Sequence, residues 1–258
     1  MKRSRFPAVV TVLCLLFLYF PIVVLVINSF NGSRFGSVWG GFSLRWYEQL
    51  FRDRSIWFAL RNTLLIGITS TLFSMVLGTL AAWALNRYRS RLQDAHYALV
   101  YTPLVVPDIL IGISLLLFFV ALKMPLGLFT IFIAHTTFCI SYVAMVVLAR
   151  LQDFDFSVIE AAQDLGASWR TIILRILLPL LAPGILSGGM LAFTLSIDDF
   201  VITFFVAGPG STTLPIQIYS MIKHGSPPMI NALSTILLCL TFLLVAASRR
   251  LTGKQITS

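Results

Sequence analysis

The stretch FPAVVTVLCLLFLYFPIVVLVINSF, residues 6–30, contains no Asp, Glu, Lys, Arg or His. A helix advances about 1.5 Å per residue, so a run of this length can cross a hydrocarbon layer about 30 Å thick. Residues 62–86 and 227–248 are also free of these five residue types. The sequence therefore predicts transmembrane helices in these three ranges.

Three further long apolar stretches contain only one or two ionisable residues each. They are residues 97–122 with Asp108, residues 124–149 with His135, and residues 176–207 with Asp198 and Asp199. Strands of a membrane barrel would show about ten residues of alternating polarity, and a backbone in lipid must satisfy its own hydrogen bonds. We therefore expect an all-α integral membrane protein with six transmembrane helices.

The composition agrees with this fold class. Of the 258 residues, 58% are hydrophobic and only 11% are charged, and the mean hydropathy is +0.91. A soluble domain carries about 25% charged residues, so a water-soluble protein is excluded. A cleaved signal peptide is the alternative for residues 1–30. That apolar run exceeds a typical signal core and no A-x-A-like site follows it, so we expect the first helix to be retained.

The Lys and Arg residues indicate the orientation, because they favour cytoplasmic loops. Six spans place both termini on one side, and twelve of the 19 Lys and Arg residues fall there. Five of the other seven lie in the long first loop, residues 31–61. We predict that both termini are cytoplasmic. The net charge of +9 then reflects this topology and contact with anionic membrane lipid, and no nucleic-acid partner is expected.

Motifs of several other functions are missing from the sequence. The three cysteines, Cys14, Cys139 and Cys239, fall inside apolar stretches without a Cys-x-x-Cys spacing, which favours buried structural thiols over a metal site. No Walker A sequence, Gly-rich dinucleotide fingerprint or Gly-x-Ser-x-Gly is present. We expect that this chain does not hydrolyse ATP and holds no metal.

The segment between the fourth and fifth predicted spans is too polar to cross a bilayer. Apolar residues recur there with helical spacing, which predicts short helices outside the membrane. It contains EAAQDLGASWRTIILRILLP, residues 160–179: Glu160, Ala161 and Ala162, then Gly166 after three residues, then ILLP after nine more. Small alanines permit close docking, a glycine permits a sharp turn, and the glutamate offers a carboxylate to a partner.

At every defined position this pattern resembles the EAA loop of ABC importer permeases. The resemblance implies a type I (MetI-like) permease bundle with a cytoplasmic coupling helix, in which Glu160, Ala161, Ala162 and Gly166 face an ATPase subunit. It implies a non-catalytic subunit without a cofactor of its own, because ATP and Mg are bound by that ATPase. The implied partners are a second, homologous permease, two ATPase subunits and a periplasmic substrate-binding protein.

Short motifs along nearly the whole chain narrow the resemblance. They are Asn28-Ser29-Phe30-Asn31, Arg45-Trp46-Tyr47, Pro107-Asp108, residues 135–139, residues 196–199 with Gly208-Pro209, Leu214-Pro215, Tyr219-Ser220 and Asn231-Ala232-Leu233. These look like the permeases of spermidine/putrescine importers. The resemblance implies a polyamine as cargo and a multi-pass place in a bacterial inner membrane. Related importers of other solutes share the scaffold, so another solute is the alternative.

The acids inside the predicted spans require a functional or structural explanation, because each charge at a helix centre raises the free energy of membrane insertion by about 2.5 to 3.5 kcal/mol. No Lys or Arg lies in the middle of any span to neutralise them. We expect Asp108 near the midplane and Asp198 and Asp199 in the outer half. Adjacent residues of a helix point about 100° apart, so one of that pair can face a pathway while the other anchors a helix.

A row of acids with nearby aromatic rings suits a polycation, through charge-assisted hydrogen bonds and cation–π contacts. The predicted substrate pathway comprises Trp46, Asp108, Ser196, Asp198 and Asp199, with Asp108 and Asp198 favoured for the pore. The alternative for each acid is a bond between helices or an ion pair with a partner permease. For Trp46 the alternative is an anchor at the membrane interface. His135 is expected to be a donor between helices.

The remaining features are interpreted as scaffold. Pro103 and Pro107 are expected to break or bend the third span around Asp108, as a gate or as a simple kink. Glycines are expected to permit close helix approach at Gly67, Gly78, Gly112, Gly184, Gly188 and Gly189. The predicted division is a first helix with its outer loop (1–61), a five-helix permease core (62–248) with the EAA loop at 150–179, and a cytoplasmic tail (249–258).

Two other classes of protein are open on sequence alone. A proton-coupled secondary transporter would also use intramembrane acids and His135, but it would need no EAA loop. An intramembrane hydrolase would need Ser196, His135 and Asp198 within reach of one another, and nothing in the sequence fixes that geometry.

Overall fold

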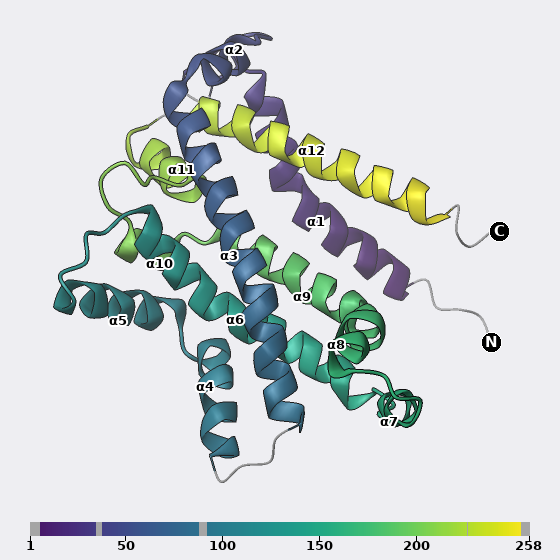
Figure 1. Cartoon of the computed structure of the whole chain (residues 1–258). Coiled ribbons are helices and arrows are strands. Elements are labelled where there is room, and N and C mark those ends of the chain that lie inside the picture. Colours follow the sequence, from purple (N-terminus) through teal and green to yellow (C-terminus); the bar gives the residue numbers. More distant parts are fainter. Residues whose placement is uncertain (1–5, 35–37, 88–91, 226, 254–258) are drawn as a thin grey trace. The chain divides into compact units, whose positions relative to one another are not determined.

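The computed structural model describes residues 6–34, 38–87, 92–225 and 227–253. It is built from helices, and the chain forms two compact units (Figure 1). The first unit combines Met1–Trp57 with Gln217–Ser258, and the second is Phe58–Ile216. The basic residues predicted at the N-terminus and the last part of the predicted tail, residues 1–5 and 254–258, lie outside the described residues.

The first unit contains α1 (Phe6–Ser29), α2 (Arg45–Arg52) and α12 (Pro227–Gly253). Helix α12 packs against both α1 and α2, so the two ends of the sequence lie side by side (Figure 1). The last helix thus groups with the N-terminal segment, whereas the sequence division placed it in the core. Helix α12 also runs through Gly253, into the predicted tail. The grouping depends on contacts between distant parts of the chain, which sequence patterns do not report.

The outer loop of this unit is organised by Asn31. Its side-chain amide donates to the carbonyl of Val38, and its side-chain oxygen accepts from the backbone N–H groups of Ser33 and Gly40. An isolated β-bridge pairs Asn31 with Phe42, whose ring stacks on Phe30. A loop that looked irregular in the sequence is therefore held by one asparagine that satisfies three backbone groups.

The second unit contains most of α3, seven further α-helices, one π-helix and the first part of α11. The elements are α3 (Arg54–Arg87), α4 (Gln93–Val105), α5 (Asp108–Ala121), α6 (Leu128–Gln152), α7 (Ser157–Asp164), α8 (Trp169–Ile172), the π-helix η1 (Ile173–Leu177), α9 (Leu178–Asp198), α10 (Val201–Val206) and α11 (Leu214–Lys223). Helix α6 packs against α4, α5, α9 and α10 and contributes the largest share of the buried core.

Small residues allow this close packing, as predicted. A Cβ added at Gly78 of α3 would lie 2.8 Å from the side chain of Val143, and one at Gly188 of α9 would lie 3.2 Å from its Cα. A Cβ added at Gly112 of α5 would lie 2.7 Å from the ring of Phe205 in α10. Backbones approach closely only where a side chain is absent, so these glycines set the distances of α3 and α9 from α6 and of α5 from α10.

The described residues include four helices long and apolar enough to cross a membrane. They are Val9–Ser29, Arg54–Arg87, Leu128–Gln152 and Trp169–Asp198, to which the bent pair α4 and α5 adds a fifth if it counts as one span. The sixth predicted span corresponds to the shorter apolar helix Pro228–Leu243. The structure therefore confirms the all-helical membrane class, with a span count that depends on the bent pair.

The third predicted span is broken where its prolines predicted a break. Helix α4 ends at Val105 and α5 begins at Asp108, with a bend of 113° between them. The break falls at Pro107, while Pro103 stays inside α4. Proline biases the preceding residue away from helical torsion angles, and Val106 is indeed extended, with ψ 131°.

The fifth predicted span is also broken, which the sequence did not indicate. Helix α9 ends at Asp198, Asp199 is extended with ψ 121°, and α10 begins at Val201. The expectation that Asp198 and Asp199 occupy one continuous helix was therefore wrong. The reason is local: the Asp199 carboxylate accepts bonds from the backbone N–H groups of Ile202 and Thr203, so Asp199 caps the first turn of α10 instead of extending α9.

Candidate functional site

The predicted coupling segment is a short exposed helix with a defined end. Helix α7 ends at Asp164, and Gly166, two residues later, has φ +76°, a value that glycine adopts without strain. The N–H of Gly166 donates to the carbonyl of Gln163, and the N–H of Ala167 donates to that of Ala162. These two bonds form a Schellman motif, so the predicted sharp turn at Gly166 is confirmed.

The two faces of α7 differ. Ile159 and Ala162 pack into the core of the chain, with Ala162 only 8% exposed, whereas Glu160 and Ala161 face outward. Both alanines were expected to face a partner. The structure turns Ala162 inward, because residues three apart share the helix face on which Ile159 is buried.

The exposed face of α7 contains apolar residues that the sequence analysis missed. Leu165 is 88% exposed and Val158 is 42% exposed, and both lie on the same side as Ala161. The two side chains form a small apolar patch on the outward side of this segment. Their spacing of three and four residues from Ala161 was the signal in the sequence that could have revealed them.

Asp155 fixes the start of α7. Its carboxylate accepts a bond from the backbone N–H of Ser157 at 3.0 Å. Hydrogen bonds from the side chain and backbone of Ser157 lower the pKa of Asp155 below its ordinary value of 3.8. The charged form is therefore the one that stabilises the first turn of α7.

A buried hydrogen-bonded network lies around His135 of α6. Nδ1 of His135 is 2.7 Å from the Ser196 hydroxyl, which is 3.2 Å from the hydroxyl of Ser70 in α3. Nε2 of His135 is 2.8 Å from the Thr203 hydroxyl, and that hydroxyl donates to the Asp199 carboxylate at 2.6 Å. His135 is the predicted donor between helices, and the network joins α3, α6, α9 and α10.

The network gives the neighbouring acids Asp198 and Asp199 different environments. Asp199 accepts bonds from the N–H groups of Ile202 and Thr203 and lies 3.3 Å from Nε2 of His135, so its carboxylate is held inside the unit. Asp198 ends α9 with an exposed side chain. Ser196, another predicted pathway residue, is only 3% exposed. Of these three residues, the structure leaves Asp198 alone accessible.

Asp108 occupies the first position of α5, directly after the break at Pro107. Its side chain is exposed. Within the described ranges no cation pairs with Asp108 or Asp198.

Trp46 is a buried anchor of the outer loop in the first unit. It is 6% exposed, and its indole N–H donates to the Asn31 carbonyl at 2.7 Å. The Arg45 guanidinium lies 5.2 Å from the centre of its ring. The predicted pathway residues therefore divide into two exposed acids and three buried residues, because burial follows from packing and not from residue type.

The residues that the structure describes contain no cluster of three or more His, Cys, Asp or Glu side chains that could hold a metal ion. Cys139 is buried, as expected, while Cys14 and Cys239 are exposed on the surface of this single chain. The exposed acids, the network and the coupling segment are thus the features that a functional interpretation must use.

Residues 74–253, which include α7, both exposed acids and all of the network except Ser70, match the profile of the binding-protein-dependent transport system inner membrane component. The chain belongs to this family. Membership makes it a multi-pass inner-membrane component of a transport system, and the role of this family is transport and not catalysis.

Curated members of the binding-protein-dependent transport family resemble the chain over most of its length. It is 44% identical to the spermidine/putrescine transport system permease protein PotC of Escherichia coli K12, over 90% of this chain and 88% of PotC. It is 45% identical to the putrescine transport system permease protein PotI of the same organism, over 92% and 86%. Haemophilus influenzae PotC is 41% identical, over 93% of both chains.

Solved structures share the fold of this family at low sequence identity. A chain of a bacterial ABC transporter that imports the acidic polysaccharide alginate has a TM-score of 0.74 at 16% identity, covering 96% of this chain and 98% of that one. A chain of the MetNI methionine ABC transporter in an inward-facing conformation has a TM-score of 0.60 at 20% identity, covering 77% and 93%. The fold is therefore that of an ABC importer permease.

Replacing the two neighbouring acids should affect stability differently. Asp199→Ala removes the partner of several buried donors, so we expect the free energy of unfolding to fall by about 1 to 3 kcal/mol. Asp198→Ala removes an exposed side chain and should stay within about 0.5 kcal/mol of wild type. Thermal unfolding of the purified variants in a mild detergent, followed by circular dichroism, measures both. Equal losses would contradict the network as the anchor of the α9–α10 junction.

The order of α7 should depend on pH through Asp155. Because folding lowers its pKa, its contribution is complete well above pH 3.8 and is lost as the pH falls through the ordinary value toward the lowered one. Amide exchange of α7, corrected for intrinsic chemistry, should therefore speed up below about pH 4. Asp155→Asn can still accept the Ser157 bond but cannot titrate, so it should lack this extra acceleration. The same acceleration in that variant would exclude Asp155 as its source.

Proposed function

We propose that this chain is the permease subunit of an ATP-driven polyamine importer, with spermidine or putrescine as cargo. The observation that carries the proposal is the exposure of Asp108 and Asp198, two carboxylates on apolar helices without a cation partner among the described residues. The names of relatives 41 to 45% identical over about nine tenths of the chain point to the same cargo.

The two acids have the chemistry that a polycation needs. An ammonium group that leaves water regains part of its solvation from a carboxylate, and nearby aromatic faces add cation–π contacts of about 0.5 to 2 kcal/mol. Separate weak sites let cargo move on, whereas one strong site would trap it.

The buried members of the predicted pathway receive positioning roles. Asp199, Ser196 and His135 hold the end of α9, and through it they orient Asp198. Trp46 anchors the outer loop through the Asn31 carbonyl. Asp108 and Asp198 are thus the proposed substrate contacts.

Helix α7 is the proposed contact with the ATPase. Its outward face combines the carboxylate of Glu160 with the exposed side chains of Val158 and Leu165. Apolar contacts supply most of the affinity of such an interface, and a charge at its edge provides specificity. The Schellman turn at Gly166 joins α7 to the span that begins at Trp169, so movement of α7 reaches α9 through a short connection.

The transport cycle is proposed to be alternating access. ATP-driven closure of an ATPase pair moves the coupling helices and opens the pathway outward, and hydrolysis resets it inward. The assembly comprises a second, homologous permease, two ATPase subunits that bind ATP and Mg, and a periplasmic binding protein. Both termini and α7 are placed in the cytoplasm, in accord with the distribution of Lys and Arg.

The alternatives differ in what they leave unexplained. A proton-coupled transporter gives no role to the exposed face of α7. An intramembrane hydrolase is favoured by the distances from His135 to Ser196 and Asp199, but the nucleophile would be only 3% exposed and already bonded to Ser70. A permease for another solute keeps the scaffold and differs only in its cargo.

Reversing the charge of Glu160 should uncouple the importer. We expect Glu160→Lys to abolish uptake while the protein remains inserted, because the ATPase interface loses its carboxylate. Asp94→Lys makes the same charge change at an exposed site at the start of α4 and should keep most uptake. Uptake of labelled polyamine at matched membrane levels measures both, and normal uptake with Glu160→Lys would remove α7 from the coupling role.

Neutralising Asp198 should block polyamine transport. In cells that lack the gene, wild type should restore uptake of labelled spermidine or putrescine, and Asp198→Asn should lower it at least tenfold. The matched control is Asp53→Asn, because Asp53 is an acid on the extramembrane connection between α2 and α3. If wild type restores no polyamine uptake, the cargo is another solute. If Asp198→Asn restores it fully, Asp198 is no substrate contact.

A further inference from the structure

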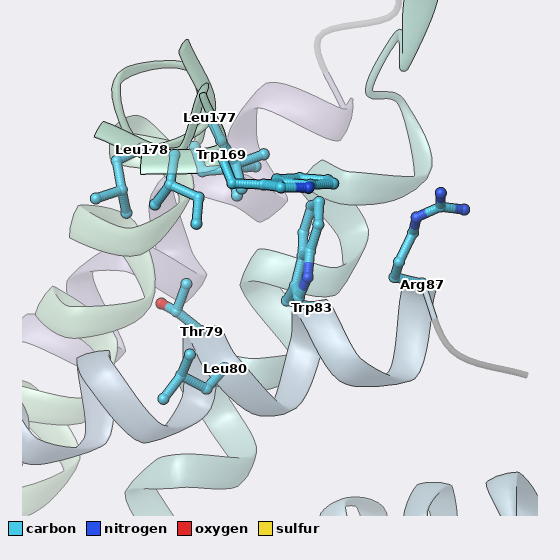
Figure 2. Close-up of a pocket in the computed structure, with 9 residues that line it drawn as sticks. Thr79, Leu80, Trp83, Arg87, Trp169, Leu177 and Leu178 are labelled. Carbon is cyan, nitrogen blue, oxygen red and sulfur yellow. The ribbon is translucent and has the colours of Figure 1, made fainter. Parts of the chain in front are cut away.

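A groove of about 650 Å³ runs between the last turns of α3 and the segment formed by α8, η1 and α9. One wall carries Thr79, Trp83 and Arg87, spaced four residues apart on one face of α3. The other wall runs from Trp169 through Ile173 toward Leu181. In Figure 2 the ring of Trp83 stands between Arg87 on one side and Thr79, Leu80 and Leu178 on the other.

The chemistry of the groove changes along its length. Arg87 and Trp169 lie at the end where α3 stops and α8 starts. Thr79 lies about two helical turns deeper along α3, and Leu181 lies about three turns beyond Trp169. Along the groove a cation is followed by two indole rings and then by leucines. A phospholipid at a membrane surface needs its surroundings in this order, from head group to acyl chain. The groove thus has the polarity profile of one leaflet.

The charge of the groove excludes the proposed cargo. Its lining includes Arg87 and no carboxylate, so a polyamine would be repelled where an anion is attracted. Its apolar part suits a hydrocarbon chain and offers an ammonium group no replacement for water. The ligand must therefore be an amphiphile with a negative head.

The groove adjoins the proposed coupling segment. The ring of Trp83 lies 6.3 Å from that of Phe156, the residue directly before α7. The opposite wall includes the π-helix Ile173–Leu177, an irregularity that often marks a functional site in helices. A molecule bound between these walls would touch both the support of α7 and the start of the following span.

We propose that this groove binds an anionic phospholipid of the cytoplasmic leaflet, with the head group at Arg87 and the two indole N–H groups and an acyl chain along Leu177 and Leu181. The assignment to that leaflet rests on the orientation in the proposed function. The bound lipid supports the base of α7, so it is a structural cofactor of coupling and not cargo.

Native mass spectrometry of the purified full chain tests the proposal. The chain is equilibrated in micelles with equal amounts of phosphatidylglycerol and phosphatidylcholine that carry identical acyl chains. Wild type should retain phosphatidylglycerol at least about fivefold over phosphatidylcholine, the contribution expected of one cation near a lipid surface. Arg87→Gln should abolish this preference. Arg170→Gln removes an equal charge from an exposed neighbour outside the groove lining and should keep it.

Filling the groove tests its apolar part separately. Ile173 is 41% exposed in one wall, so Ile173→Trp should occupy the space without disturbing the core and should reduce retention of both lipids. Equal retention of the two lipids by wild type, or equal losses in Arg87→Gln and Arg170→Gln, would overturn the proposal. So would release of phosphatidylglycerol when the complete importer assembles, since the groove would then be a contact between protein subunits.

This measurement is independent of transport. It needs neither cargo nor ATP, so the lipid preference can fail while polyamine uptake is normal, which would refute the lipid site and leave the proposed function intact. If the chain prefers phosphatidylglycerol but does not support polyamine uptake, the lipid site stands and the proposed cargo is refuted.

Discussion

The second unit depends on a constraint that hydrocarbon imposes on polar groups: each must find its partner inside the protein. His135 meets this constraint for α6, α9 and α10 at once, because its ring bonds the Ser196 and Thr203 hydroxyls and lies beside Asp199. Ser196 extends the network to Ser70 of α3. Since Thr203 donates its proton to Asp199, its oxygen accepts from Nε2, and Nδ1 is left for Ser196. The same bonds that bury Asp199 end α9 at Asp198 and begin α10. The direction of an accessible acid is thus set by a network that contacts no cargo.

Helix α6 relates the two exposed acids to each other. Asp198 ends α9 beside the network around His135, whereas Asp108 begins α5, which also packs against α6. Val143 of α6 receives the glycine faces of α3 and α9. Close packing on α6 thus positions both helices that carry an exposed acid.

The coupling end of the unit consists of α7, whose two ends are fixed by hydrogen bonds, and of the groove beside Trp83. Helix α7 is closed by a Schellman turn at Gly166 and by the Asp155 bond at its start, so it can move as one piece. Phe156, directly before α7, lies beside Trp83 of the groove. A lipid in that groove would stiffen the support, and in the importer that we propose α7 contacts an ATPase. Coupling in this chain then involves the membrane as well as the protein partner.

The sequence by itself determined the membrane class, the exposed helix with its turn at Gly166, the close contacts at glycines and the break at Pro107. These features follow from local properties: the length of an uncharged run, the left-handed freedom of glycine and the torsional bias before proline. Only the tertiary structure decided that Asp198 faces out while Asp199 faces in, that Ala162 and Trp46 are buried, that Leu165 is exposed, and that α12 joins α1. Burial depends on which distant helix covers a side chain, and neither residue type nor spacing along one helix contains that information.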